Sequence, residues 1–177
     1  GLMRLIAKFI DTQAQELLHA NVRLRIIGRR DRFADDLCVA LQSLEQRSSK
    51  NTRLNLTVAL DYGGRQDIAS SALAIAKEIE AGMLTADEVN DDLLKSRMST
   101  KILPPVDLLI RTGGEKRLSN FLLWDLSYAE LFFSDKLWPD FTRSDLFDAI
   151  TSFRGRQRRF GGGHYDIDQS LRAVVSD

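Results

Sequence analysis

Cysteine is nearly absent from this 177-residue chain, which has Cys38 alone. A single cysteine excludes an intrachain disulfide and a cysteine-based metal site. It suits a reducing compartment, so we expect a cytoplasmic location. Histidine is scarce too: His19 and His164 lie far apart in the sequence and form no HExxH zinc motif.

An excess of charge of one sign is also missing, because 25 Lys and Arg residues balance 25 Asp and Glu residues. General nucleic-acid and anionic-membrane binders carry a basic excess, so we expect no nucleic-acid partner and only local anion sites. No apolar run approaches the roughly 20 residues that a membrane span needs. The content of 44% hydrophobic and 28% charged residues is typical of a globular domain.

Hydrophobic periodicity predicts alternating helices and strands. Strands are predicted over residues 22–28, 54–60, 106–110 and 131–133, and helices over residues 2–19, 33–44, 68–79, 85–94 and 142–153. Another helix is predicted to begin near Phe121, with Ser119 as its cap. Alternation of this kind is typical of a parallel sheet covered by helices. We therefore expect one α/β domain over residues 1–163 and a C-terminal tail over residues 164–177.

The start of the chain has no helix-capping residue, since Gly1 and Leu2 open directly onto the first apolar stripe. We therefore expect that the chain has been cut or that upstream residues are missing.

Glycine and arginine residues gather where two predicted strands end. One strand runs into Tyr62-Gly63-Gly64-Arg65, and the next runs into the segment from Arg111 to Asn120. Ligands of open parallel sheets bind at the carboxyl ends of strands. Glycine pairs let backbone N–H groups approach a ligand closely, and guanidinium forks match phosphate oxygens. These features predict a phosphate or diphosphate site. A surface turn whose arginines form ion pairs fits the pattern about equally well.

Glu130, at the start of the short strand, is the candidate metal ligand. Mg²⁺ keeps several waters and takes few protein carboxylates when phosphates are present. A salt bridge to a nearby arginine is the commoner role for a carboxylate at such a position.

The longest motifs are Asp107-Leu-Leu-Ile-Arg-Thr-Gly-Gly-Glu115, Arg117-Leu-Ser-Asn-Phe-Leu-Leu-Trp124, Tyr128-Ala-Glu130 and Leu137-Trp-Pro-Asp140. They resemble the C-terminal signature of the cis-prenyltransferases, the family of undecaprenyl diphosphate synthase. Asn21-Val-Arg-Leu-Arg-Ile-Ile-Gly28, Tyr62-Gly-Gly-Arg65 and Arg158-Arg-Phe-Gly-Gly162 resemble the same family in the same order. The resemblance implies a parallel β-sheet flanked by helices that is missing its first strands.

The resemblance also implies an activity. Enzymes of this family condense isopentenyl diphosphate onto an allylic diphosphate such as farnesyl diphosphate, with cis geometry and Mg²⁺. The bacterial product is undecaprenyl diphosphate, the precursor of a lipid carrier for cell-wall sugars. A homodimer is implied as well, with peripheral membrane contact through the lipid product.

The residues that would carry this activity follow from the motifs. The resemblance implies that Arg111, Arg117 and Ser119 hold the diphosphate of the isopentenyl unit and that Glu130 binds Mg²⁺. The other implied substrate-binding residues are Gly113, Gly114, Glu115, Leu118, Tyr62 and Arg65.

Two motifs of the family do not occur in the 177 residues. One resembles His-x-Met-Asp-Gly-Asn-Gly-Arg-Trp and holds the family's catalytic aspartate; the other resembles Phe-Ser-x-Glu-Asn-Trp. We therefore expect no catalytic residue in this chain, and little or no activity from it alone. The alternative is a non-catalytic partner or diphosphate-binding subunit of a prenyltransferase complex. Arg111, Arg117 and Glu130 argue against that alternative, because an inactive subunit has less need of them.

Overall fold

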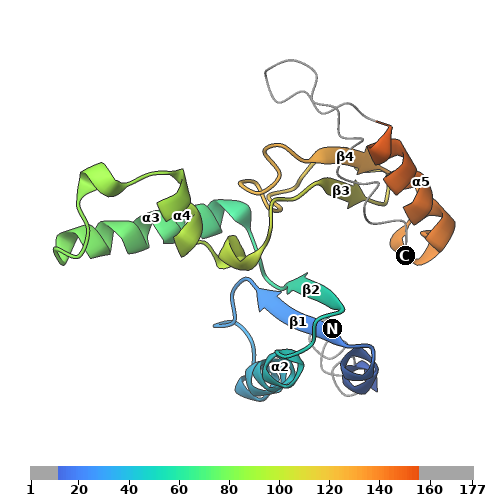
Figure 1. Ribbon diagram of the computed structural model, residues 1–177, viewed down its shortest axis with the longest axis horizontal. Coiled ribbons are helices and arrows are strands. Elements are labelled where there is room, and N and C mark those ends of the chain that lie inside the picture. Colours follow the sequence, from blue (N-terminus) through green and yellow to red (C-terminus); the bar gives the residue numbers. More distant parts are fainter. Residues whose placement is uncertain (1–11, 156–177) are drawn as a thin grey trace. The chain divides into compact units, whose positions relative to one another are not determined.

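The computed structural model describes residues 12–155, which form two compact units (Figure 1). The first unit holds residues 12–106 and 118–127, and the second holds residues 107–117 and 128–155. Of the helix predicted over residues 2–19, residues 12–19 are described and are helical. The predicted tail over residues 164–177 and the motif at residues 158–162 lie outside the described residues.

The first unit is built on a parallel pair of strands. β1 (Val22–Ile27) leads into α2 (Asp35–Ser48), and β2 (Leu54–Ala59) leads into α3 (Gly64–Glu80). β1 pairs with β2 in register, with Leu24 opposite Leu56. A 3₁₀ turn η1 (Ala86–Glu88), the helix α4 (Asp91–Arg97) and a second 3₁₀ turn η2 (Ser99–Ile102) complete this part of the chain.

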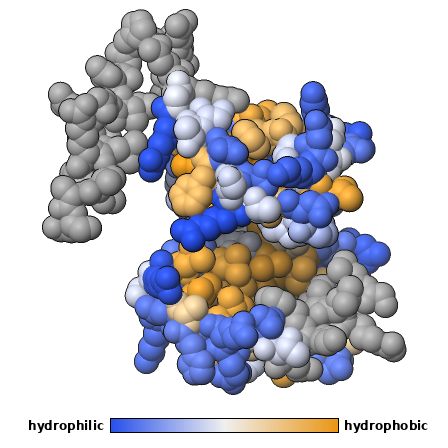
Figure 2. Space-filling view, turned by 90° about the vertical axis from the view of Figure 1, so that its right-hand side faces the viewer, coloured by the Kyte–Doolittle hydropathy of each residue, from blue (hydrophilic) through white to orange (hydrophobic). Residues whose placement is uncertain are grey.

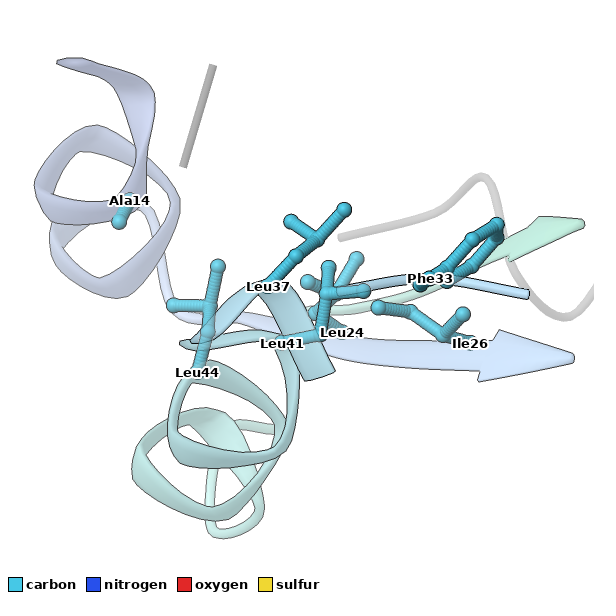
Figure 3. Close-up of a cluster of buried hydrophobic side chains, with 7 residues drawn as sticks. All are labelled: Ala14, Leu24, Ile26, Phe33, Leu37, Leu41 and Leu44. Carbon is cyan, nitrogen blue, oxygen red and sulfur yellow. The ribbon is translucent and has the colours of Figure 1, made fainter. Parts of the chain in front are cut away.

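The core of this unit lies between α2 and one face of β1 (Figure 3). Side chains of a strand alternate between its faces, so Leu24 and Ile26 point to the same side. The face of α2 predicted from the sequence meets them, and its Leu41 and Leu44 are only 2% and 1% exposed. The buried cluster comprises Ala14, Leu24, Ile26, Phe33, Leu37, Leu41 and Leu44.

Side chains of α2 also bind the backbone of β1. Leu24 N–H donates to Ser48 Oγ at 3.0 Å, and Ile26 N–H donates to Glu45 Oε1 at 2.8 Å. Arg30 pairs with the other oxygen of Glu45 at 2.7 Å. An unpaired strand edge is prone to pair with other chains, and these contacts cover backbone donors of β1 that β2 does not take.

The second unit has its own parallel pair of strands. β3 (Leu108–Arg111) pairs with β4 (Glu130–Phe133), with Leu108 opposite Glu130. The 3₁₀ turn η3 (Trp138–Asp140) and the helix α5 (Arg143–Arg154) follow. Thr142 caps α5, as predicted, in a capping box with Asp145. Parallel strands followed by helices in both units confirm the α/β class.

Three predicted helix starts are wrong. α3 begins at Gly64 and not at the predicted residue 68. The Thr85–Glu88 capping box is present, but it caps only η1; the α-helix after it begins at Asp91, where Asn90 Oδ1 accepts the N–H of Leu93 at 2.9 Å. The helix predicted over residues 33–44 spans Asp35–Ser48, and Phe33 packs into the core from the loop before it.

The helix predicted to begin near Phe121 is absent from the described structure, which has turns over residues 119–128. Ser119, Asn120 and Leu122 have φ angles of 49°, 66° and 43°, in the left-handed region. A right-handed helix cannot pass through such residues. Ser119 therefore does not act as a helix cap.

Several hydrophobic side chains reach the surface among hydrophilic ones (Figure 2). The most exposed in the first unit is Met83, and in the second unit Tyr128 and Trp138 are 79% and 73% exposed. Among the residues that the structure describes, no helix combines the length and the apolar character that crossing a membrane requires.

Leu44→Ala should destabilise the protein by about 2–5 kcal/mol, because it opens a cavity between α2 and β1. The free energy of unfolding from urea titration measures this. Val39→Ala is the matched control: it lies on the same helix, but Val39 is 66% exposed, so the change should be small. Equal effects of the two substitutions would contradict the location of the core.

Candidate functional site

The start of α3 is bound to a distant segment of the first unit. Gly64 N–H donates to the carbonyl oxygen of Asn120 at 2.7 Å, and Arg65 N–H donates to Asn120 Oδ1 at 2.8 Å. Asn120 Nδ2 donates in turn to Gln66 Oε1 at 3.2 Å. The first turn of a helix leaves N–H groups without intrahelical partners. Here Asn120 takes two of them, so these two amides are not available to a ligand.

The glycine pair of the Tyr62–Arg65 motif has a packing role at this contact. A Cβ atom built on Gly64 would lie 3.0 Å from both Cγ and backbone N of Leu123. A Cβ atom on Gly63 would lie 2.7 Å from Asn120 Nδ2. These glycines therefore lie in close contact with Asn120 and Leu123.

Two further contacts hold residues 118–127 within the first unit. Lys95 pairs with Asp125, whose side chain is only 2% exposed, and it also donates to the carbonyl oxygen of Thr100 at 2.8 Å. The rings of Tyr62 and Phe121 meet edge to face, with centroids 6.1 Å apart. Burial raises the pKa of the Tyr62 phenol, and the carboxylates of Asp67 and Asp125 add to this, so the phenol stays protonated at neutral pH.

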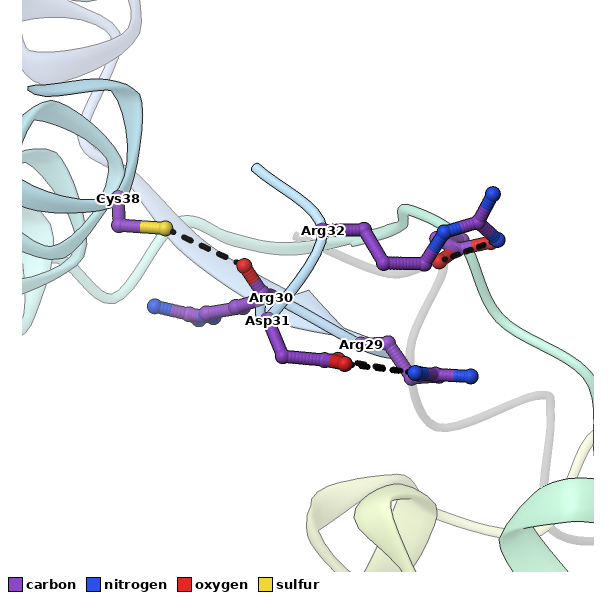
Figure 4. Close-up of polar contacts among 6 residues, drawn as sticks. Arg29, Arg30, Asp31, Arg32 and Cys38 are labelled. Atoms are coloured by element: carbon purple, nitrogen blue, oxygen red, sulfur yellow. Dashed lines mark hydrogen bonds and ion pairs between the residues drawn. The ribbon is translucent and has the colours of Figure 1, made fainter. Parts of the chain in front are cut away.

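A cavity of about 350 Å³ opens in the first unit at the carboxyl ends of β1 and β2. The loop after β1, the loop after β2, the first turns of α3 and Asn120 line it. The two arginines that line it have carboxylate partners. Arg29 pairs with Asp31 at 2.6 Å (Figure 4), and Arg32 pairs with Asp61 at 3.2 Å. Cys38 Sγ donates to the carbonyl oxygen of Arg30 at 3.5 Å (Figure 4).

The second unit carries the two arginines predicted to hold a diphosphate. Arg111 ends β3, and its guanidinium donates to the carbonyl oxygen of Arg117. The Glu115 carboxylate is shared: it pairs with Arg117 and lies 3.9 Å from the guanidinium of Arg111. The Arg117 side chain is 68% exposed. The carboxylate of Glu115 is thus close to two guanidinium groups at the end of β3. This arrangement matches the surface turn with ion-paired arginines that the sequence also allowed.

The glycines between these arginines form the turn. Gly113 and Gly114 have φ angles of 90° and 75°, which favour glycine. Their N–H groups donate to the carbonyl oxygens of Lys136 at 2.7 Å and Ser134 at 3.0 Å. The amides of this glycine pair therefore bind the loop after β4, as those of the first pair bind Asn120.

Glu130 is the first residue of β4, and its backbone N–H donates to the carbonyl oxygen of Asp107 at 2.9 Å. Residues 12–155 contain no group of three or more His, Cys, Asp and Glu side chains that could hold a metal ion. A single carboxylate suits Mg²⁺ only where phosphate oxygens and water supply the other ligands.

The structure divides the predicted site residues between the units. Arg111, Gly113, Gly114, Glu115, Arg117 and Glu130 belong to the second unit, and Tyr62, Arg65, Leu118 and Ser119 to the first. Sequence reasoning missed Asn120 as a structural link. The signal that could have indicated this role is the residue type, because asparagine tolerates the left-handed region and often caps helices.

A family model described as "Putative undecaprenyl diphosphate synthase" matches residues 1–161. The chain belongs to the undecaprenyl diphosphate synthase (cis-prenyltransferase) family. The chain is 46% identical over 161 residues to a (2E,6E)-farnesyl-diphosphate-specific ditrans,polycis-undecaprenyl-diphosphate synthase of Xanthomonas axonopodis pv. citri. It is 44% identical over 161 residues to an isoprenyl transferase of Caulobacter vibrioides. Each match covers 91% of this chain, which spans 63% and 62% of the length of the two relatives.

A solved structure of another diphosphate synthase shares the fold. The crystal structure of lavandulyl diphosphate synthase from Lavandula x intermedia, in complex with dimethylallyl diphosphate, matches with a TM-score of 0.87 and 38% identity. The match covers 91% of this chain and 70% of the plant chain. Both the family and the α/β fold expected from the motifs are confirmed.

The Asp145 carboxylate should make the stability of the second unit depend on pH. Hydrogen bonds from Lys136 and Thr142 lower the pKa of Asp145 from 3.8 to about 2. A carboxyl with a lowered folded pKa stabilises the fold above its unfolded pKa, and this contribution is lost as the pH falls from about 4 towards 2. We expect Asp145→Asn to lower the melting temperature at pH 7.

Circular dichroism melts between pH 7 and pH 2.5 test this expectation. The difference between Asp145→Asn and the unmodified chain should shrink below about pH 4, as the carboxyl of the unmodified chain takes up its proton. Asp148→Asn removes an exposed carboxylate from the same helix and serves as the control. A difference that stays constant over this pH range would contradict the role of Asp145.

Proposed function

We propose that this chain carries the isopentenyl diphosphate half of a cis-prenyltransferase that makes undecaprenyl diphosphate. Arg111, Arg117 and Ser119 hold the diphosphate of the isopentenyl unit. The observation that carries the proposal is the pair of guanidiniums at the end of β3, both associated with the single carboxylate of Glu115.

The charge balance at Glu115 supports this role. A diphosphate carries more negative charge than one carboxylate and offers more acceptor oxygens to guanidinium forks. It can therefore replace Glu115 as the partner of Arg117, which is already largely exposed. In the condensation the allylic substrate loses its diphosphate and the isopentenyl unit keeps its own. The arginines would hold the group that remains, which orients the isopentenyl carbon chain for attack.

Mg²⁺ is part of the proposal, with Glu130 as its ligand. The ion would neutralise diphosphate charge, while the substrate and water would complete its coordination. Gly113, Gly114, Glu115 and Leu118 would shape the turn that presents the arginines. Tyr62 and Arg65, which belong to the first unit, are the remaining proposed substrate-binding residues.

The remaining features of the proposal concern the whole enzyme. None of the 177 residues supplies the family's catalytic aspartate motif, so the chain alone should transfer no prenyl group. We further propose a cytoplasmic homodimer that meets the membrane through its lipid product. Exposed Tyr128 and Trp138 in the second unit are the kind of aromatic surface that dimers bury.

A non-catalytic, diphosphate-binding subunit of a prenyltransferase complex is the second candidate. The presence of Arg111, Arg117 and Glu130 favours the enzyme over this candidate. Joining the chain to the N-terminal third of a relative distinguishes the two. A catalytic half should then transfer prenyl groups, and a non-catalytic subunit should not.

The double variant Arg111→Ala/Arg117→Ala should weaken isopentenyl diphosphate binding by about a hundredfold, because two charge-assisted contacts are lost. Isothermal titration calorimetry with Mg²⁺ present measures the affinity. Arg143→Ala removes the same charge from α5, where Arg143 lies 5.4 Å from the centroid of the Phe147 ring, and should change little. Unchanged affinity in the double variant would overturn the proposed site.

Glu130→Gln should raise the Mg²⁺ concentration needed for half-maximal isopentenyl diphosphate binding by about tenfold, since an amide is a poorer ligand than a carboxylate. A Mg²⁺ titration at constant substrate concentration measures this. Asp148→Asn is the control for charge. The same Mg²⁺ dependence in Glu130→Gln and the unmodified chain would exclude Glu130 as a ligand.

A further inference from the structure

Ser119 and Asn120 occupy a backbone conformation that their neighbours must maintain. Both lie in the left-handed region, with φ angles of 49° and 66°. Asparagine adopts this region with little penalty, whereas serine does so less readily. Consecutive left-handed residues outside glycine are uncommon, so contacts around them must compensate for the local cost.

Asn120 makes those contacts with both its backbone and its side chain. Its carbonyl oxygen accepts from Gly64 N–H, its Oδ1 accepts from Arg65 N–H, and its Nδ2 donates to Gln66 Oε1. The N-cap residue of α3, Gly63, has no side chain and makes no side-chain cap bond. Asn120, 55 residues away from Arg65, therefore caps α3 from a different segment.

The two glycines at the start of α3 leave room for Asn120 and Leu123. A side chain at Gly63 would collide with Asn120 Nδ2, and a side chain at Gly64 would press on Leu123. α3 itself is a helix of 17 residues, which gives the cap a rigid base. The turn of residues 118–121 thus has an anchor, although it lies outside any helix or strand.

We propose that Asn120 is a positioning residue for Ser119. By binding the start of α3 it holds Ser119 in the left-handed conformation, and so sets the direction of the Ser119 hydroxyl, the group that the proposed function assigns to the diphosphate. The inference rests on the proposed function and adds to it a residue that contacts the helix and not the substrate.

Asn120→Gly removes the side chain and leaves the backbone unstrained, since glycine readily adopts a φ of 66°. We expect it to weaken isopentenyl diphosphate binding by about tenfold, the effect of one poorly oriented hydrogen bond to a charged group. Asn90→Gly is the matched control, because Asn90 caps α4 in the same unit and its Oδ1 also accepts a backbone N–H. It should leave the affinity unchanged. The melting temperature of each variant is recorded with its affinity.

A double-mutant cycle with Ser119→Ala tests whether Asn120 acts through Ser119. Once the hydroxyl is gone, Asn120→Gly should cause no further loss of affinity. Additive losses, or an unchanged affinity in Asn120→Gly, would overturn the inference and leave the proposed function intact. If the unmodified chain does not bind isopentenyl diphosphate, the proposed function fails first and the inference fails with it.

A second variant covers the case in which Asn120→Gly does not fold. Gln66→Ala removes only the acceptor of Asn120 Nδ2 and keeps both backbone bonds of α3. It should weaken the affinity less than Ser119→Ala does, and this loss should also disappear in the Ser119→Ala background. An unchanged affinity in Gln66→Ala, with Asn120→Gly unfolded, would count against positioning by the Asn120 side chain.

Discussion

The amides of Gly64 and Arg65, at the start of α3, donate to Asn120, and the arrangement of residues 118–127 depends on this contact. It brings the Tyr62–Arg65 motif and the Ser119–Asn120 pair into direct contact. Gly64 leaves room for the second segment, because a Cβ atom there would lie 3.0 Å from the backbone N of Leu123. A motif that reads as a phosphate-binding loop is therefore, in part, a packing motif.

In the second unit, ion pairs determine the arrangement of the charged side chains. Arg111 and Arg117 are both associated with the carboxylate of Glu115, in a chain of zero net charge. A carboxylate partner keeps two cations close together without leaving them to repel each other. This shared ion pair is the basis on which we propose that a diphosphate takes the place of Glu115.

The sequence predicted most of the fold because burial follows periodicity. The alternating face of β1 and the apolar stripe of α2 lie where the pattern placed them. The sequence-based predictions are wrong where local capping signals compete with tertiary contacts. The capping box at Thr85 predicts the start of a helix over residues 85–94, but it caps a 3₁₀ turn. Ser119 was read as a helix cap, but the residues after it turn in the left-handed region. Tertiary contacts made by Asn120 outweigh the local preference there.

The sequence by itself determined the family, the α/β class and the candidate residues, because each depends on residue identity and on short-range spacing. Only the tertiary structure decided which groups those residues contact. The glycine amides bind other parts of the chain, Glu115 serves both arginines, and Asn120 caps a helix 55 residues away. Hydrogen bonds between distant segments depend on how the chain packs, and no local pattern in the sequence encodes the partner of a given donor.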